Sequence, residues 1–275
     1  MDATITGLEE SKKGFQLSDR WIQIITTVAI IGLWELLSRT GLIKPVHLPS
    51  PTRVLSTFIY ITREGYPQDI TIFKHIKATV WRIIQGYLLA TATAIPLGLL
   101  IGSHFLLERA ANPVITFARS IATISLLPLA IAWFGVGELS SILLIMYGAF
   151  WAILTNTIQG VKQVDVNFIN VGRMFGATRR HIFFRVVLPS TLPRIFSGMK
   201  IGLGVSFMVI IAAEMVGTVK GLGALIQQSR LYYRTDITIV GMIFIGIFGL
   251  IISIGLDRLE RVMLPWAIGL EEVKR

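Results

Sequence analysis

The chain contains no cysteine, few histidines and few charges, and each of these shortages excludes a class of function. Without cysteine there is no disulfide framework, no thiolate nucleophile and no cysteine-ligated metal. The four histidines lack a metal-ligating spacing such as H-E-x-x-H. They are His47, His75, His104 and His181. No G-x-x-x-x-G-K-S/T phosphate loop occurs in the sequence. We therefore expect no catalytic residue, no metal site and no cofactor bound by this chain.

Charged residues make up only 15% of the 275 residues, whereas hydrophobic residues make up 53%. Globular domains carry about 25% charged residues, so this composition places the chain among membrane proteins. The formal net charge of +10 would also suit a nucleic-acid partner. The basic residues, however, flank the apolar segments and form no single stripe interleaved with aromatic residues. This distribution favours anionic lipid headgroups over nucleic acid as the partner.

The sequence has about six apolar segments long enough to cross a bilayer, for which about 20 residues are needed. The segments lie near residues 21–38, 78–103, 114–134, 139–160, 198–217 and 236–256. Their many small residues suit helices that pack closely in lipid. No fixed repeat, linker or low-complexity stretch divides the chain. We predict an all-α membrane protein with an N-terminal segment at 1–20, one transmembrane domain at 21–266 and a tail at 267–275.

The distribution of Lys and Arg predicts how the chain is oriented in the membrane. An even number of spans puts both termini on one side, together with the connections at 104–113 and 161–197. That side carries fourteen Lys and Arg residues, and the other side carries nine. Because basic loops face the cytoplasm, we expect both termini and the 161–197 connection to be cytoplasmic. Arg82 and Lys200 are expected to extend their charged groups to the two membrane interfaces.

The stretch NVGRMFGATRRHIFFRVVLPSTLP at 170–193 places charges and prolines between apolar segments. Apolar residues recur at helical spacing on both sides of Gly176, which predicts two short helices with Thr178 as the N-cap of the second. Pro189 is expected to end that second helix. An exposed Phe175 with a basic rim would suit docking to a partner protein. An amphipathic helix pair lying on lipid headgroups is the alternative.

The same stretch carries a family signature. From Gly176 onward it matches, position for position, the E-A-A-x3-G-x9-I-x-L-P signature of ABC importer permeases, with Val186 at the isoleucine position. Across residues 78–266 the chain resembles the nitrate, sulfonate, taurine and bicarbonate group of these permeases, most closely the taurine and aliphatic sulfonate members. Further stretches that carry the resemblance are LPSPTRVLSTF (48–58), PLAIAWFGVGELSSILLI (128–145), AAEMV (212–216), GLG (221–223), TDI (235–237) and RLERVMLPW (258–266).

The resemblance implies a type I ABC importer permease fold with a cytoplasmic coupling helix that contacts an ATPase. It implies a multi-pass transport subunit, not an enzyme, in the bacterial inner membrane. The implied partners are a second copy of the permease, two ATPase subunits that hold ATP and Mg, and an extracytoplasmic solute-binding protein. Carried over to this sequence, the coupling loop is residues 161–197. Its contact residues would be Gly172, Arg173, Phe175, Gly176, Ala177, Thr178, Arg179, His181, Leu188 and Pro189.

The chain departs from the family pattern in two places. The E-A-A triplet stands as Asn170-Val171-Gly172, which keeps a small residue only at its last position. The stretch RSIATISLLPL at 119–129 has lost two or three prolines and a tryptophan. Ionisable groups are costly in lipid unless they face the bundle interior. The candidate residues for a substrate pathway are Arg119, Pro128 and Glu214. For the arginine and the glutamate, a structural partner is the alternative.

By resemblance, the transported solute is a small anion or zwitterion, with taurine or a sulfonate first and nitrate or bicarbonate second. A secondary transporter that works without an ATPase is an alternative, but it would need an ion site at mid-membrane, usually with paired acids or inverted repeats. An intramembrane enzyme would need a nucleophile with a base, or a metal cluster. The sequence shows neither pattern.

Overall fold

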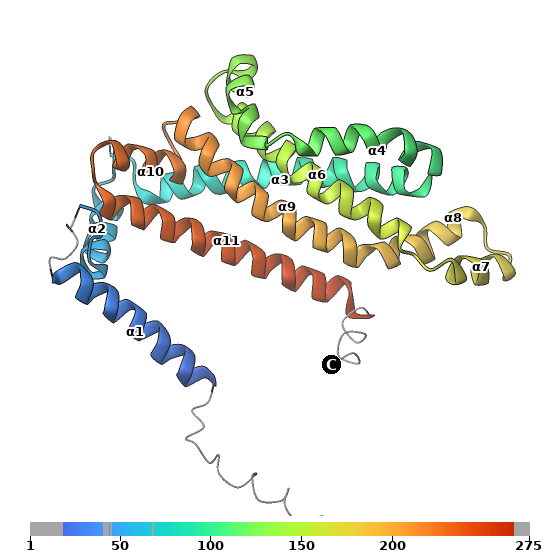
Figure 1. Ribbon diagram of the computed structural model, residues 1–275, viewed down its shortest axis with the longest axis horizontal. Helices are drawn as coiled ribbons and strands as arrows, with labels where there is room; N and C mark the ends of the chain where they lie inside the picture. The colour runs from blue at the N-terminus through green and yellow to red at the C-terminus, as the bar shows by residue number, and fades with distance from the viewer. Residues whose placement is uncertain (1–18, 41–43, 45, 68, 267–275) are drawn as a thin grey trace, which may run out of the picture.

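The computed structural model describes residues 19–40, 44, 46–67 and 69–266, which fold almost entirely into helices (Figure 1). The α-helices are α1 (Asp19–Arg39), α2 (Pro51–Arg63), α3 (Ile72–Ser103), α4 (Phe105–Ser120), α5 (Leu127–Phe134), α6 (Glu138–Lys162), α7 (Val166–Met174), α8 (Arg179–Ile182), α9 (Leu188–Gly217), α10 (Leu222–Leu231) and α11 (Thr235–Met263). A 3-10 turn, η1 (Thr123–Leu126), precedes α5, and a π-helical turn, η2 (Phe183–Val187), precedes α9. The predicted terminal segments at 1–20 and 267–275 lie outside the described residues, except for Asp19 and Arg20.

Helix α6 lies between α3 and α9 and packs closely against both (Figure 1). A Cβ atom at Gly98 of α3 would lie 2.7 Å from the Cβ of Thr157, and one at Gly198 of α9 would lie 2.7 Å from the Cβ of Asn156. Only glycine permits backbones to approach this closely. The small residues of the apolar segments therefore set the helix spacing, as the sequence predicts.

The third apolar segment is not one straight helix. The sequence predicts a span at 114–134, but α4 begins earlier and is bent by 80° from Thr123–Phe134. Ile121 and Ala122 have extended backbones at the bend. The hydroxyl of Tyr147 on α6 donates a hydrogen bond to a carbonyl near the end of α4 (2.7 Å). Hydropathy does not reveal this bend because apolar residues continue through it. The described residues thus contain five spanning helices, or six if α4 and α5 form one broken span.

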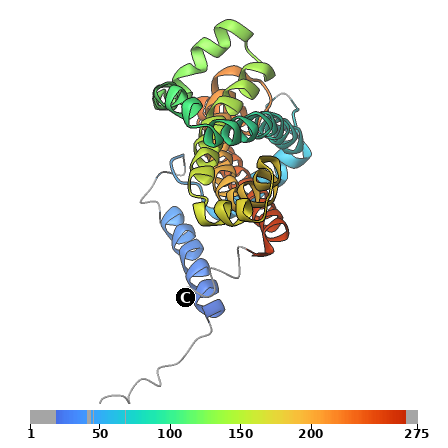
Figure 2. The same ribbon diagram turned by 90° about the vertical axis from the view of Figure 1, so that its right-hand side faces the viewer.

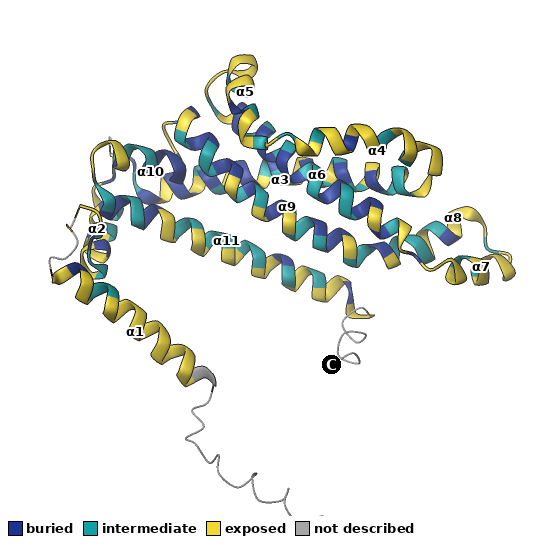
Figure 3. Cartoon of the chain, viewed as in Figure 1, coloured by how far each residue is buried: buried dark blue, intermediate teal, exposed yellow. Residues whose placement is uncertain are grey.

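Helix α1 stands apart from the packed helices (Figures 1 and 2) and contacts α2. Apolar side chains are exposed along most of its length (Figure 3). Its attachment is polar: the Glu35 carboxylate accepts hydrogen bonds from the Thr52 N–H (3.2 Å) and hydroxyl (3.0 Å), and the Trp34 indole N–H donates to the Pro49 carbonyl (3.1 Å). In a bilayer, the apolar surface of α1 faces lipid or another chain.

The two ends of the bundle differ (Figure 1). Helices α7 and α8 lie beyond one end, which we call the loop end. Helices α2 and α10 lie at the opposite end, which we call the α10 end. At the α10 end, Ile61, Ile72, Leu225 and Ile237 join α2, α3, α10 and α11 in one buried cluster. The α10 end is therefore a packed cap, whereas the loop end projects outward.

Candidate functional site

The segment predicted to be the coupling loop contains two helices joined at a glycine, as the sequence predicts. Asp165 begins α7 by accepting a hydrogen bond from the Asn167 N–H (2.8 Å), and Thr178 begins α8 by accepting one from the His181 N–H (3.3 Å). Between the helices, Gly176 has a φ of +74°, in the left-handed region that favours glycine. This joint turns the chain sharply and sets α7 and α8 beyond the ends of the long helices (Figure 1).

Apolar side chains at this turn are exposed at the loop end. Phe175 and Met174 are 87% and 86% exposed, and Phe168 and Val171 of α7 are exposed as well. We call these four residues the knob. Exposed basic residues close to them in the chain are Arg173, Arg179, Arg180 and His181. An exposed apolar patch with a charged rim is typical of an interaction surface.

Gly172, the remaining small residue of the signature triplet, lies where α7 packs on α8. A Cβ atom at this position would lie 3.4 Å from Cγ1 of Ile182, a buried residue. The Ala177 N–H donates a hydrogen bond to the Gly172 carbonyl (3.0 Å), which closes the turn. The small residue therefore lets the two helices of the loop pack together, whereas Asn170 at the glutamate position is exposed.

The prediction that Pro189 ends the second loop helix is wrong. The chain stays helical from Arg179 to Gly217, because α8 continues through η2 into α9. In the π-helical turn, the Leu188 N–H donates to the Phe183 carbonyl five residues back. A wider turn at this point accommodates the proline ring, which would otherwise clash with a carbonyl four residues earlier. Helix α8 is thus joined to α9 as one helical rod.

A buried ion pair lies at the α10 end of that rod. The Arg82 guanidinium of α3 donates to the Glu214 carboxylate of α9 (2.8 Å) and to the Lys220 carbonyl (2.7 Å). The two side chains are 4% and 0% exposed. The Thr79 hydroxyl and the Gly223 N–H donate further hydrogen bonds to Glu214, each 2.9 Å long. A buried carboxylate with this many partners holds α3, α9 and the start of α10 together.

Gly221 completes this cluster by close approach. A Cβ atom at this position would lie 2.3–2.5 Å from the carboxylate atoms of Glu214, and the φ of +147° is one that other residues rarely adopt. The carbonyl of Gly221 also bonds to the ring of His75 (2.9 Å). The G-L-G stretch at 221–223 is therefore required by the geometry of the ion pair. Sequence reasoning missed this pairing of Arg82, whose side chain is 4% exposed and bonded within the bundle.

Lys200 likewise has acidic partners within the bundle. Its ammonium group lies 2.7 Å from Asp257 and 2.5 Å from Glu260, both on α11. These two salt bridges connect α9 to α11 towards the loop end. The side chain is therefore a cross-link between helices.

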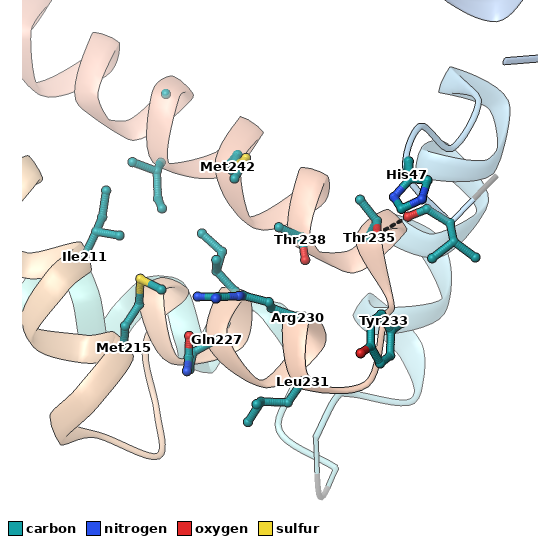
Figure 4. A pocket seen from close by; sticks show the side chains of 14 residues that line it. His47, Ile211, Met215, Gln227, Arg230, Leu231, Tyr233, Thr235, Thr238 and Met242 are labelled. Atoms are coloured by element: carbon teal, nitrogen blue, oxygen red, sulfur yellow. Dashed lines mark hydrogen bonds between the residues drawn. The ribbon is translucent and has the colours of Figure 1, made fainter. Parts of the chain in front are cut away.

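A cavity of about 1100 Å³ lies near the α10 end, between α9, α10, α11 and the segment at 46–47 (Figure 4). Ile211, Met215 and Met242 form part of its apolar wall. Arg230 and Gln227 of α10 supply polar groups from one side. The side-chain oxygen of Gln227 is buried and has no hydrogen-bond partner among the described residues. This cavity is mostly apolar and much larger than a small solute.

A second, polar cavity of about 240 Å³ lies between α4 and α6 in the half of the bundle near the loop end. Its lining residues are Glu108, Asn112, Ile115, Thr116, Arg119, Thr155, Ile158, Gln159 and Lys162. Among the three predicted pathway residues, only Arg119 lines either cavity. Pro128 lies in the first turn of α5, and Glu214 belongs to the buried ion pair. The structure does not bring these three residues together.

The long apolar helices are packed through glycines and carry a protruding loop with an exposed knob. These features define a multi-pass membrane protein. The comparisons identify the family. Residues 94–268 match the family described as the binding-protein-dependent transport system inner membrane component. The chain belongs to this family of ABC transporter permeases.

Individual relatives cover nearly the whole chain. The taurine transport system permease protein TauC of Escherichia coli K12 is 32% identical over 245 residues, which are 89% of each chain. The bicarbonate transport system permease protein CmpB of Synechocystis is 33% identical over 251 residues, 88% of each chain. Among solved structures, the inward-facing MetNI methionine ABC transporter is similar with a TM-score of 0.60 and 21% identity over 70% of this chain and 95% of that one. This likeness confirms the predicted type I ABC importer permease fold.

Proposed function

We propose that this permease is the membrane-spanning subunit of an ATP-driven importer that works as a homodimer. Two separate ATPase subunits hold ATP and Mg and carry out the hydrolysis, and an extracytoplasmic binding protein delivers the solute. The importer lies in the bacterial inner membrane, with the loop end and both termini in the cytoplasm. The family to which the chain belongs supports this assignment, and so does the excess of Lys and Arg on the loop side.

The observation that carries the proposal is the continuous helical connection between the segment next to the knob and the far end of the bundle. The helical rod from Arg179 to Gly217 has 39 residues, or about 58 Å at 1.5 Å per residue. One end packs against α7 through Gly172 and Ile182. The other end carries Glu214, which is paired with Arg82. A displacement of the knob by ATPase closure is therefore transmitted to the α10 end, where solute enters.

The ten coupling residues divide into two groups in this mechanism. Phe175 and the basic side chains of Arg173, Arg179 and His181 contact the ATPase. The residues of the second group fix the position of α7 relative to α8. They are Gly172, Gly176, Ala177, Thr178, Leu188 and Pro189. The exposure of the first group supports this division. For the second group, support comes from the contact of Gly172 with Ile182, the positive φ of Gly176 and the N-cap hydrogen bond of Thr178.

The solute is a small anion or zwitterion, with taurine or a sulfonate first and nitrate or bicarbonate second. The taurine and bicarbonate permeases among the relatives support this class. Arg119 attracts the anion within the membrane, and Pro128 fixes the start of α5 after the bend. Glu214 acts at the pathway's outer end by holding α10 in place through its ion pair.

Two measurements test the proposal. The permease should copurify with its cognate ATPase, and uptake into proteoliposomes should stop when ATP is omitted. The cognate binding protein should bind taurine, alkanesulfonates, nitrate or bicarbonate. Uptake without ATP would instead support a secondary transporter, and a binding protein specific for a sugar would overturn the proposed solute class.

A further inference from the structure

Two polar stripes face each other across the cavity between α4 and α6. Both stripes follow helical spacing on helices that are otherwise rich in apolar residues. On α4 the stripe is Glu108, Asn112, Thr116 and Arg119, and on α6 it is Thr155, Gln159 and Lys162. Most of these side chains are exposed on the single chain, and polar side chains are costly on a lipid-facing surface unless they have partners or line a polar space. The matching stripes therefore indicate a hydrophilic groove.

The charges in this groove do not balance. Lys162 and Glu108 form a salt bridge of 2.5 Å and neutralise each other. Arg119 has no salt bridge and no side-chain hydrogen bond to any other described residue. It lies eleven positions after Glu108 on α4, or about 16 Å along the helix axis. An uncompensated guanidinium therefore lies at the inner end of the groove, away from the ion pair.

We infer that the groove is a binding site for a small oxyanion, held by Arg119. The ligand class is a sulfonate, sulfate or phosphate group, carried by a dissolved solute or by a lipid headgroup. A guanidinium offers paired N–H donors that match two oxygens of such a group. The neutral donors Asn112 and Gln159 line the groove beside it. Water takes up about 30 Å³ per molecule in the liquid, so a cavity of about 240 Å³ holds a small oxyanion with several waters.

This inference rests on the proposed function and adds to it, because it gives the permease an anion site of its own near the cytoplasmic exit. The larger cavity at the α10 end also holds an arginine without a salt bridge among the described residues, Arg230, but the rest of its lining is mostly apolar. In the α4–α6 groove, neutral polar side chains surround Arg119, and we therefore assign charge selection by the permease to this groove. Arg119 acts there as a specificity-determining residue.

The test uses the whole permease–ATPase complex in lipid nanodiscs, with methanesulfonate as the dissolved probe. The thermal unfolding midpoint is measured against probe concentration in discs of phosphatidylcholine alone and in discs that also contain phosphatidylglycerol. Arg119→Gln removes the charge, and Arg119→Lys keeps the charge but loses the paired donors. Arg109→Gln is the matched control, because Arg109 also lies on α4 but stacks on Phe105 (4.2 Å) and does not line the groove.

We expect methanesulfonate to raise the midpoint of the wild type and of Arg109→Gln, to raise that of Arg119→Lys less, and to leave that of Arg119→Gln unchanged. If phosphatidylglycerol alone produces the same Arg119-dependent rise, a lipid headgroup is the ligand. A rise that persists in Arg119→Gln, or no rise with either anion, would overturn the inference. ATP-driven uptake by the wild type is measured in parallel: its absence counts against the proposed importer, whereas the Arg119-dependent rise tests the site alone.

Discussion

Replacement of Gly176 tests the coupling loop most sharply. Its φ of +74° lies in the left-handed region, where a residue with a Cβ atom costs about 1–2 kcal/mol more than glycine. A Cβ atom at this position would meet no heavy atom within 4 Å, so the backbone conformation accounts for the whole cost. For the β-branched replacement Gly176→Val we expect at least this cost. The left-handed backbone conformation at residue 176 then becomes about 5 to 30 times less populated relative to other backbone conformations.

Two controls separate strain from coupling. Gly135→Val places the same side chain at a φ of +78°, also with no heavy atom within 4 Å, but on the connection between α5 and α6. Gly176→Asn keeps the joint with a residue that tolerates left-handed backbone. The assays are copurification of the ATPase and ATP-driven uptake into proteoliposomes.

We expect Gly176→Val to lose most of its ATPase binding and most of its ATP-driven uptake, although it still inserts into the membrane. Gly176→Asn should retain most of its ATPase binding and uptake, and Gly135→Val should still copurify with the ATPase. Normal uptake by Gly176→Val would refute the coupling role of the joint. Equal loss of ATPase binding in Gly135→Val would show that the effect is general strain.

Three further predictions concern the knob and the buried ion pair. Phe175→Ser should weaken ATPase binding by about tenfold or more without lowering the thermal unfolding midpoint, because the side chain is 87% exposed; a lower midpoint would contradict its role as a contact. Glu214→Ala should destabilise the detergent-solubilised protein by about 3–5 kcal/mol in a denaturant titration, because it leaves the buried Arg82 with only the exposed carboxylate of Glu138 at 3.4 Å; a loss below about 1 kcal/mol would refute the ion pair. Gly221→Ala should cost about 1–3 kcal/mol through overlap with Glu214, whereas Gly204→Ala, with open space around it, should be neutral; equal stability of the two variants would contradict the close approach.

Much of the fold follows from local patterns that the sequence displays directly. Apolar segments of spanning length predict the long helices, and the chain's small residues predict their close packing. The two helices of the predicted coupling loop could also be predicted, because Gly176 and Thr178 determine only the backbone next to them. Its turn and its N-cap both lie where these residues predict them.

The features that sequence reasoning missed depend on contacts between distant segments. Arg82 and Glu214 are 132 positions apart, and neither residue alone reveals that the other is its partner. The bend after α4 occurs without any interruption of the apolar pattern, and a hydrogen bond from Tyr147 of another helix supports it. Pro189 predicts a helix end by its own chemistry, but a π-helical turn accommodates it. Contacts between distant segments decide the first two cases, and a wider local turn decides the third.

The most direct test of the central claim is uptake by the reconstituted complex. The permease, its cognate ATPase and its binding protein are placed in proteoliposomes with taurine as the labelled solute, and ATP is supplied on the side that holds the knob. We predict that uptake requires ATP, the binding protein and an intact Phe175–Gly176 turn together. Uptake that proceeds without ATP, or a permease that does not bind the ATPase at all, would contradict the claim that this chain is moved from its loop end.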